Sequence, residues 1–219
     1  MLHFEEKGSG KYTFILLHNA GGDSSFFTQQ IDFLIRFGKV VLIDLPGHGQ
    51  SESDYDPTVS YFSDQVIQLC KELQCENIIA IGLNYGANIL LEINASNPGL
   101  LCASVMIDPP IFINAEVNTL IEKNIHELES DSSLQHAHKI VKASFIKTDD
   151  VTRQIAIQAF AKIDAHYLAQ LYRNLIDWDR SSQEKVKQVN HPSLLITTDA
   201  ALCSIEDMKR VNPDIMSAK

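Results

Sequence analysis

Residues 78–88 read Ile78-Ile-Ala-Ile-Gly82-Leu83-Asn84-Tyr85-Gly86-Ala87-Asn88, which predicts a buried strand, a sharp turn and the start of a helix. Gly82 and Gly86 flank the turn and would let the strand and the helix pack closely around Asn84. Asparagine is among the few residues other than glycine that readily accept a positive φ. We therefore expect Asn84 to occupy a strained position at the tip of the turn.

Short apolar runs alternate with amphipathic helical stretches on both sides of this turn, up to about residue 110. Each run is nearly continuous apolar, as expected of a strand that helices cover on both faces. We therefore expect an α/β fold with a mostly parallel sheet and helices on both faces. The expected strands are Tyr12 to His18, Lys39 to Asp44, Asn77 to Leu83, Cys102 to Asp108 and Ser193 to Thr197, and the expected helices include Ser25 to Phe37, Tyr61 to Leu73 and Ile205 to Val211.

Residues 115–188 break this alternation, because they predict several consecutive helices with no strand signal. Strand character returns only at Ser193. We therefore expect an α/β core made of residues 1–114 and 189–219, with residues 115–188 inserted after its sixth strand as a helical subdomain. At 219 residues the chain is short for two independent domains.

The composition argues against several classes of function. The formal net charge is −10 and the lysines and arginines form no cluster, so the chain would repel phosphate backbones and anionic lipid. Four cysteines are scattered without metal-ligand spacing, and we expect them to be reduced. The first residues lack the charged-then-apolar pattern of a signal peptide, and no run of eighteen apolar residues appears. We expect a cytoplasmic, soluble protein whose partner is a small molecule, with no metal, no cofactor, no nucleic acid and no membrane.

Two other strand ends carry glycine turns. In Phe14-Ile-Leu-Leu-His18-Asn19-Ala20-Gly21-Gly22, the small residues would let backbone N–H groups point into a cavity, as an oxyanion hole requires. Asp44-Leu-Pro46-Gly47-His48-Gly49-Gln-Ser51 predicts a sharp loop at the carboxyl end of a strand, where open α/β sheets bind ligands. His48 is fixed inside this loop, so we expect it to be structural rather than catalytic.

With these three segments in order, the chain resembles the α/β-hydrolase superfamily, in its lid-bearing esterase and C–C hydrolase-like branch. Residues 82–86 match the G-x-S-x-G nucleophile elbow except at the serine, whose place Asn84 takes. The resemblance implies oxyanion donors at the backbone N–H groups of Ala20 and Tyr85, with His18 and Asn19 at the substrate pocket. It also implies that residues 115–188 form a cap over that pocket.

The catalytic side chains depart from the pattern of this family. Asn84 has no anionic form near neutral pH, so it cannot act as an activated serine. Asp199 lies two residues before the usual place of the catalytic acid, and Asp108, the alternative acid after strand six, precedes a proline as turn residues often do. Relatives continue with an eighth strand, a histidine and a closing helix, whereas this sequence ends at Lys219. We therefore expect the C-terminal strand, the helix and the catalytic base to be missing.

A missing eighth strand would leave Ser193 to Thr197 as an exposed, apolar edge strand, which natural proteins avoid. We expect a homodimer in which residues 193–197 of two copies cover each other. In a monomer, Asn212 to Lys219 would have to fold back over the strand instead.

Three functions remain open on the sequence. The first is an inactive or impaired esterase-type hydrolase that still binds a small acyl or carbonyl compound. The second is an active hydrolase with a serine or aspartate nucleophile, the epoxide hydrolase type included, seen here in a substituted or truncated form. The third is a non-catalytic ligand-binding or protein-interaction module on the hydrolase scaffold.

Overall fold

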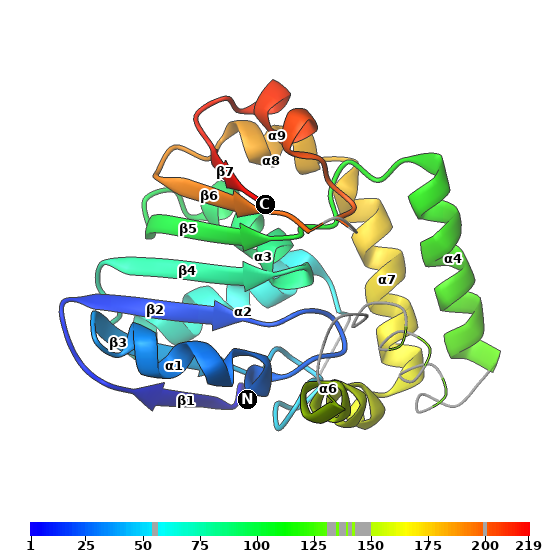
Figure 1. Ribbon diagram of the computed structural model, residues 1–219, viewed down its shortest axis with the longest axis horizontal. Helices are drawn as coiled ribbons and strands as arrows, with labels where there is room; N and C mark the ends of the chain where they lie inside the picture. The colour runs from blue at the N-terminus through cyan, green and yellow to red at the C-terminus, as the bar shows by residue number, and fades with distance from the viewer. Residues whose placement is uncertain (54–56, 131–134, 136–138, 140–141, 143–149, 199–200) are drawn as a thin grey trace.

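The computed structural model describes residues 1–53, 57–130, 135, 139, 142, 150–198 and 201–219. Within them, a seven-stranded sheet has the order β1-β3-β2-β4-β5-β6-β7 (Figure 1). Neighbouring strands are parallel, except that β1 pairs with β3 in the antiparallel direction. The strands are β1 (Phe4–Lys7), β2 (Tyr12–Leu17), β3 (Gly38–Ile43), β4 (Ile78–Leu83), β5 (Leu101–Ile107), β6 (Ser193–Ile196) and β7 (Met216–Ala218).

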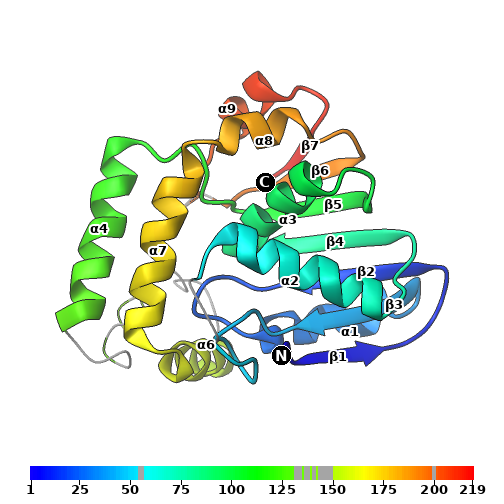
Figure 2. The ribbon, with the colours of Figure 1, turned by 180° about the vertical axis from the view of Figure 1, so that it is seen from behind.

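Helices cover both faces of this sheet, as the apolar strands predict. The short helix η1 (Ser24–Phe27) and α1 (Thr28–Leu34) lie on the face seen in Figure 1, whereas α2 (Val59–Glu72) and α3 (Tyr85–Ser96) lie on the face seen in Figure 2. Because side chains alternate along a strand, Phe14 and Leu16 of β2 join the core under α1, and Ile15 and Leu17 join the core under α2. The expected α/β architecture is confirmed.

The helical insertion follows β5, the fifth strand in the described part of the chain rather than a sixth. Between β5 and β6 the chain carries α4 (Ala115–Ser130), α6 (Asp150–Lys162), α7 (Ala165–Asp179) and α8 (Ser182–Lys187). Helices α4 and α7 pack along each other and stand beyond the carboxyl ends of the strands (Figures 1 and 2). Helix α8 packs instead on α3 and on α9 (Ile205–Val211). None of the helices in the described residues is long and apolar enough to cross a membrane.

The two ends of this insertion are tied together by one carboxylate. Asp179, the last residue of α7, accepts hydrogen bonds from the backbone N–H groups of Phe112 (2.9 Å) and Ile113 (2.8 Å). Hydrogen bonds to a charged acceptor are stronger than neutral ones. The position of α4 and α7 over the sheet is therefore fixed at the point where the chain leaves the core and returns to it.

Two short strands differ from the sequence prediction. Strand β7 pairs with β6 in parallel, with Leu194 opposite Met216 and Ile196 opposite Ala218, so residues 193–197 are not an edge strand. The last residues cover that edge, which was the alternative to a homodimer, and the backbone groups of β6 gain partners from them. Strand β1, Phe-Glu-Glu-Lys, is exposed beyond its first residue. It contains no apolar run from which the sequence could predict a strand.

Replacing Gly86 with alanine should destabilise the fold. A Cβ at this position would overlap the backbone carbonyl oxygen of Leu17, because the start of α3 packs directly on the end of β2. We expect Gly86→Ala to lower the free energy of unfolding by about 3 kcal/mol, the upper end of overpacking effects. Urea unfolding followed by circular dichroism measures this change.

Gly99→Ala is the matched control, because a Cβ on Gly99 would meet no atom within 4 Å. Its φ of +89° disfavours alanine, so we expect a cost of about 1 kcal/mol for this variant. Equal losses in the two variants would show that the close approach of α3 to β2 does not limit stability.

Candidate functional site

The turn between β4 and α3 has the strained geometry expected of it. Asn84 has φ 50° and ψ −112°, and a Cβ on Gly82 would lie 2.6 Å from the backbone nitrogen of Ala87. The backbone N–H of Asn84 donates to the carbonyl of Ile107 (2.7 Å), and its side-chain Nδ2 donates to the carbonyl of Asp108 (3.1 Å). The carboxamide is therefore held against the end of β5.

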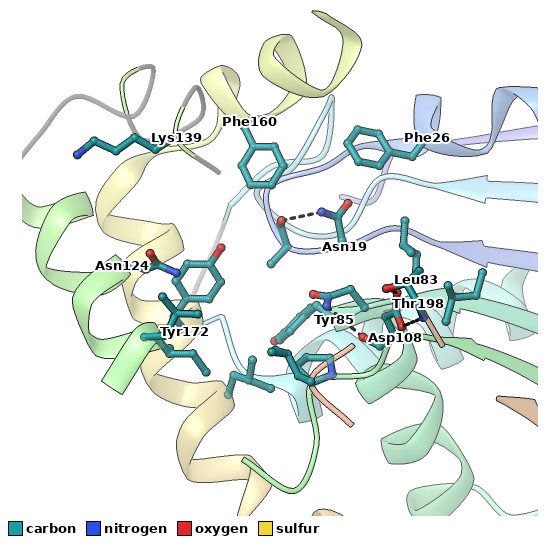
Figure 3. Close-up of a pocket in the computed structure, with 18 of the residues that line it drawn as sticks. Asn19, Phe26, Leu83, Tyr85, Asp108, Asn124, Lys139, Phe160, Tyr172 and Thr198 are labelled. Carbon is teal, nitrogen blue, oxygen red and sulfur yellow. Dashed lines mark hydrogen bonds between the residues drawn. The ribbon is translucent and has the colours of Figure 1, made fainter. Parts of the chain in front are cut away.

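A cavity of about 1090 Å³ lies over this turn (Figure 3). Its floor includes Asn19 and Ala20 after β2, Asn84 and Tyr85 at the turn, and Asp108 after β5. Its walls come from α4, α6 and α7, and much of the lining is apolar. The structure thus brings together five residues that the sequence had singled out on three separate segments. That the N–H groups of Ala20 and Tyr85 act as oxyanion donors stays a prediction.

Of the two candidate acids, the structure describes only Asp108. Asp108 has φ 45°, and its carboxylate accepts hydrogen bonds from the backbone N–H (2.8 Å) and the hydroxyl (2.9 Å) of Thr198. Its carboxylate thus joins the loop after β6 to the end of β5. Asp199 lies outside the described residues. Among the described residues that line the cavity there is no histidine, so no imidazole there could pair with Asp108.

His18 is not at the cavity, in contrast to the expectation that it belongs to the substrate pocket. It is fully buried beneath the turn, where its Nε2 accepts from the N–H of Leu45 (2.9 Å) and its Nδ1 bonds the carbonyl of Asn19 (2.8 Å). An accepting Nε2 means that Nδ1 carries the proton. His18 therefore links the end of β2 to the end of β3 as a neutral imidazole.

His48 is structural in the same way, as the sequence indicated. Its Nε2 accepts from the N–H of Gly21 (3.0 Å), its Nδ1 bonds the carbonyl of Pro46 (2.9 Å), and its ring centroid lies 5.1 Å from that of His18. Burial lowers the pKa of His18 and lowers that of His48 to about 3. The two imidazoles hold the turns after β2 and β3 together and remain uncharged at neutral pH.

Several cavity residues had no signal in the sequence. Thr198 lies at the cavity and is bonded to Asp108. The ring of Phe160 on α6 packs so closely on Gly21 that a Cβ there would overlap it. Asn124 of α4 and Tyr172 of α7 also line the cavity. Helical periodicity predicts which face of a helix is inward but not what that face meets. Within the described residues, no group of three His, Cys, Asp or Glu side chains could hold a metal ion.

Stability should fall in acid because of the two buried imidazoles. The folded chain holds both histidine pKa values below the ordinary 6.5, so only the unfolded chain gains these protons as the pH drops. The contribution of the two neutral imidazoles to the free energy of unfolding is complete above about pH 6.5 and is lost as the pH falls below this value. At pH 5 the loss from His48 should be about 2 kcal/mol, and the lowered pKa of His18 adds a further loss; urea unfolding at pH 7.5 and pH 5 measures both.

His48→Gln should remove about 2 kcal/mol of this pH dependence, although it also lowers stability at pH 7.5 by disturbing the two turns. His126→Gln, at an exposed position of α4, is the control for the substitution itself, because it keeps both buried imidazoles. A free energy of unfolding that is equal at the two pH values would contradict the neutral, buried state of these imidazoles.

Comparison with known proteins places the chain in a family. It matches the family described as "Alpha/beta hydrolase family" over residues 14–211. It is 25% identical over 155 residues to the dihydrolipoyllysine-residue acetyltransferase component of the acetoin cleaving system of Cupriavidus necator, a match that covers 70% of this chain and 40% of that protein. It is 28% identical over 115 residues to the karrikin insensitive 2 receptor IA of Petunia hybrida, covering 50% of this chain and 42% of the receptor. The chain thus spans about two fifths of the length of these relatives.

The fold is also that of solved structures. The esterase of Exiguobacterium antarcticum superposes with a TM-score of 0.86 at 15% identity, covering 99% of this chain and 85% of the esterase. At this identity the likeness shows the fold alone. The family match extends over residues 14–211. The sheet order and the glycine-flanked turn between β4 and α3 agree with this match. This chain therefore belongs to the α/β-hydrolase family.

Proposed function

We propose that this protein binds a small acyl or carbonyl compound in the cavity beneath α4, α6 and α7, and that it is inactive or impaired as a hydrolase. The observation that carries the proposal is the side chain at the tip of the turn. Asn84 stands in the cavity where the family has its nucleophile, and its amide is bonded to the backbone of Asp108.

Acyl transfer needs a nucleophile, and Asn84 at this turn does not provide one. A nucleophile needs an anionic or readily deprotonated oxygen or sulfur, and a carboxamide offers neither, because its nitrogen lone pair is delocalised. A general base must lie within hydrogen-bond reach of the group that it activates. The described cavity residues include no histidine, and the carboxylate of Asp108 accepts two hydrogen bonds from Thr198. Neither the nucleophile nor its base is supplied by these residues.

The cavity supports binding in spite of this. Its volume of about 1090 Å³ is at the upper end of what small-molecule sites enclose, and such sites are mostly apolar with a few polar groups. Ala20 and Tyr85 lie together at its floor, where their N–H groups would donate to a carbonyl oxygen. One relative is named a receptor, which is consistent with ligand binding on this scaffold.

An active hydrolase is the second candidate, because the chain has the fold of an esterase and because Asp108 places a carboxylate in the cavity. In that case Asn84 would be a substitution for a serine or aspartate nucleophile. Activity measurements on two variants of this residue separate the two candidates.

The protein should show no saturable hydrolysis of p-nitrophenyl butyrate. Asn84→Ser should gain little, since a serine without its base falls roughly 10⁶-fold short of a complete triad in kcat. Asn84→Ala is the baseline, because it has no oxygen at the turn. Saturable turnover by the unaltered protein, or turnover by Asn84→Ser far above that of Asn84→Ala, would favour the active hydrolase instead.

The cavity should bind phenyl butyrate, a neutral ester with an apolar ring. At roughly 0.3 kcal/mol per non-hydrogen atom its Kd would be on the order of 1 mM, within reach of a ligand-observed NMR titration. Val117→Trp places an indole into the cavity from α4 and should weaken binding by at least about tenfold, a loss of 1.4 kcal/mol. Phe33→Trp, at an exposed position of α1 outside the cavity, should leave the Kd unchanged. Binding that survives Val117→Trp would show that the ester occupies another site.

A further inference from the structure

The wall of the cavity that faces the turn carries polar side chains without protein partners. Tyr172 of α7 and Asn124 of α4 both line the cavity, and Figure 3 shows them beside each other, with the Tyr172 hydroxyl directed into it. Within the described part of the chain, neither side chain makes a hydrogen bond. Tyr85 and Asp108 lie on the opposite side of the cavity (Figure 3).

Polar groups in a mostly apolar cavity need a partner. Tyr172 and Asn124 are partly exposed in the cavity, and a ligand that displaces water from them must supply a partner, because a hydroxyl or amide buried without one costs free energy. Burial raises the pKa of Tyr172 above its ordinary value, so its hydroxyl stays protonated and can both donate and accept. Asn124 offers one amide donor group and one carbonyl acceptor. Together they present an uncharged site that suits a hydroxyl or carbonyl oxygen.

The charges around the cavity disfavour an anionic ligand. The carboxylate of Asp108 lies at the floor, held by Thr198, and would repel an anion. Lys139 pairs with Glu127 at 3.4 Å, its side chain is 53% exposed, and Figure 3 shows its ammonium directed away from the cavity. Lys123 is also exposed. Since the described residues of the lining include no buried cation, an anion that entered the cavity would lose its hydration without a compensating charge from them.

We propose that Tyr172 and Asn124 select an uncharged ligand with two polar ends, one a carbonyl at the turn and the other a hydroxyl or carbonyl oxygen bound by this pair. The middle of the ligand is apolar, to match the lining between them. This inference rests on the proposed ligand-binding function and adds the class of compound to it.

Three esters of butyric acid test the proposal by isothermal titration calorimetry or NMR. They are phenyl butyrate, 4-hydroxyphenyl butyrate and 4-carboxyphenyl butyrate, which share the acyl group and differ only at the far end. The hydroxyl compound should bind about fivefold more tightly than phenyl butyrate, the gain from one neutral hydrogen bond. The carboxylate compound should bind more weakly than either.

Tyr172→Phe removes one oxygen and should abolish the advantage of the hydroxyl compound, so that 4-hydroxyphenyl butyrate and phenyl butyrate bind this variant with equal Kd. Tyr167→Phe is the matched control on the same helix, because the Tyr167 hydroxyl donates to the carbonyl of Pro46 (3.0 Å) outside the cavity. It should keep the fivefold ratio.

The outcomes separate the two proposals. If none of the three esters binds, the proposed function fails and this inference fails with it. If phenyl butyrate binds but the hydroxyl brings no advantage, or if Tyr172→Phe retains that advantage, only the inference about Tyr172 and Asn124 is overturned. Tightest binding of 4-carboxyphenyl butyrate would overturn the uncharged ligand class while leaving the binding function in place.

Discussion

The close contact between the start of α3 and the end of β2 is the constraint on which the site depends. β2 and β4 are adjacent parallel strands with Leu17 opposite Gly82, so the turn after β4 passes directly beside the turn after β2. No side chain fits between Gly86 and the carbonyl of Leu17. The chain makes this approach only by turning sharply at Asn84, with a positive φ that few residues other than glycine accept. Ala20 and Tyr85 consequently line the same cavity.

Buried polar groups hold the neighbouring turns in place. The imidazoles of His18 and His48 each join two turns through one accepted and one donated hydrogen bond. Asp44 accepts from the backbone N–H groups of Ser24 (2.8 Å) and Gln50 (2.9 Å). All of these groups satisfy their hydrogen-bonding needs within the protein, which a buried polar group requires. Their bonds show that they stabilise the floor of the cavity.

The helices over the cavity are anchored by a second buried carboxylate. Glu92 of α3 accepts from the hydroxyl of Ser60 (3.1 Å) on α2 and from the indole N–H of Trp178 (2.6 Å) on α7, and it pairs with Lys185 (2.7 Å) on α8. With the bonds of Asp179 to Phe112 and Ile113, this fixes α7 relative to the core at two points. These bonds keep the roof of the cavity in place independently of the residue at the turn, because the fold and the chemistry of a site depend on different residues.

The sequence by itself determined the strands between Tyr12 and Ile107, the glycine-flanked turn at Asn84 and the helical insertion. Their signals are local, since apolar runs and small residues follow from what a covered strand or a tight turn needs. Only the tertiary structure decided the rest. Strands β1 and β7 are too short for the sequence pattern to predict them. They form because β3 and β6 offer them unpaired backbone N–H and C=O groups. The burial of His18, the bonds between Asp108 and Thr198, and the meeting of Asn124 with Tyr172 join segments far apart in the chain, and such partners are set by packing rather than by local sequence.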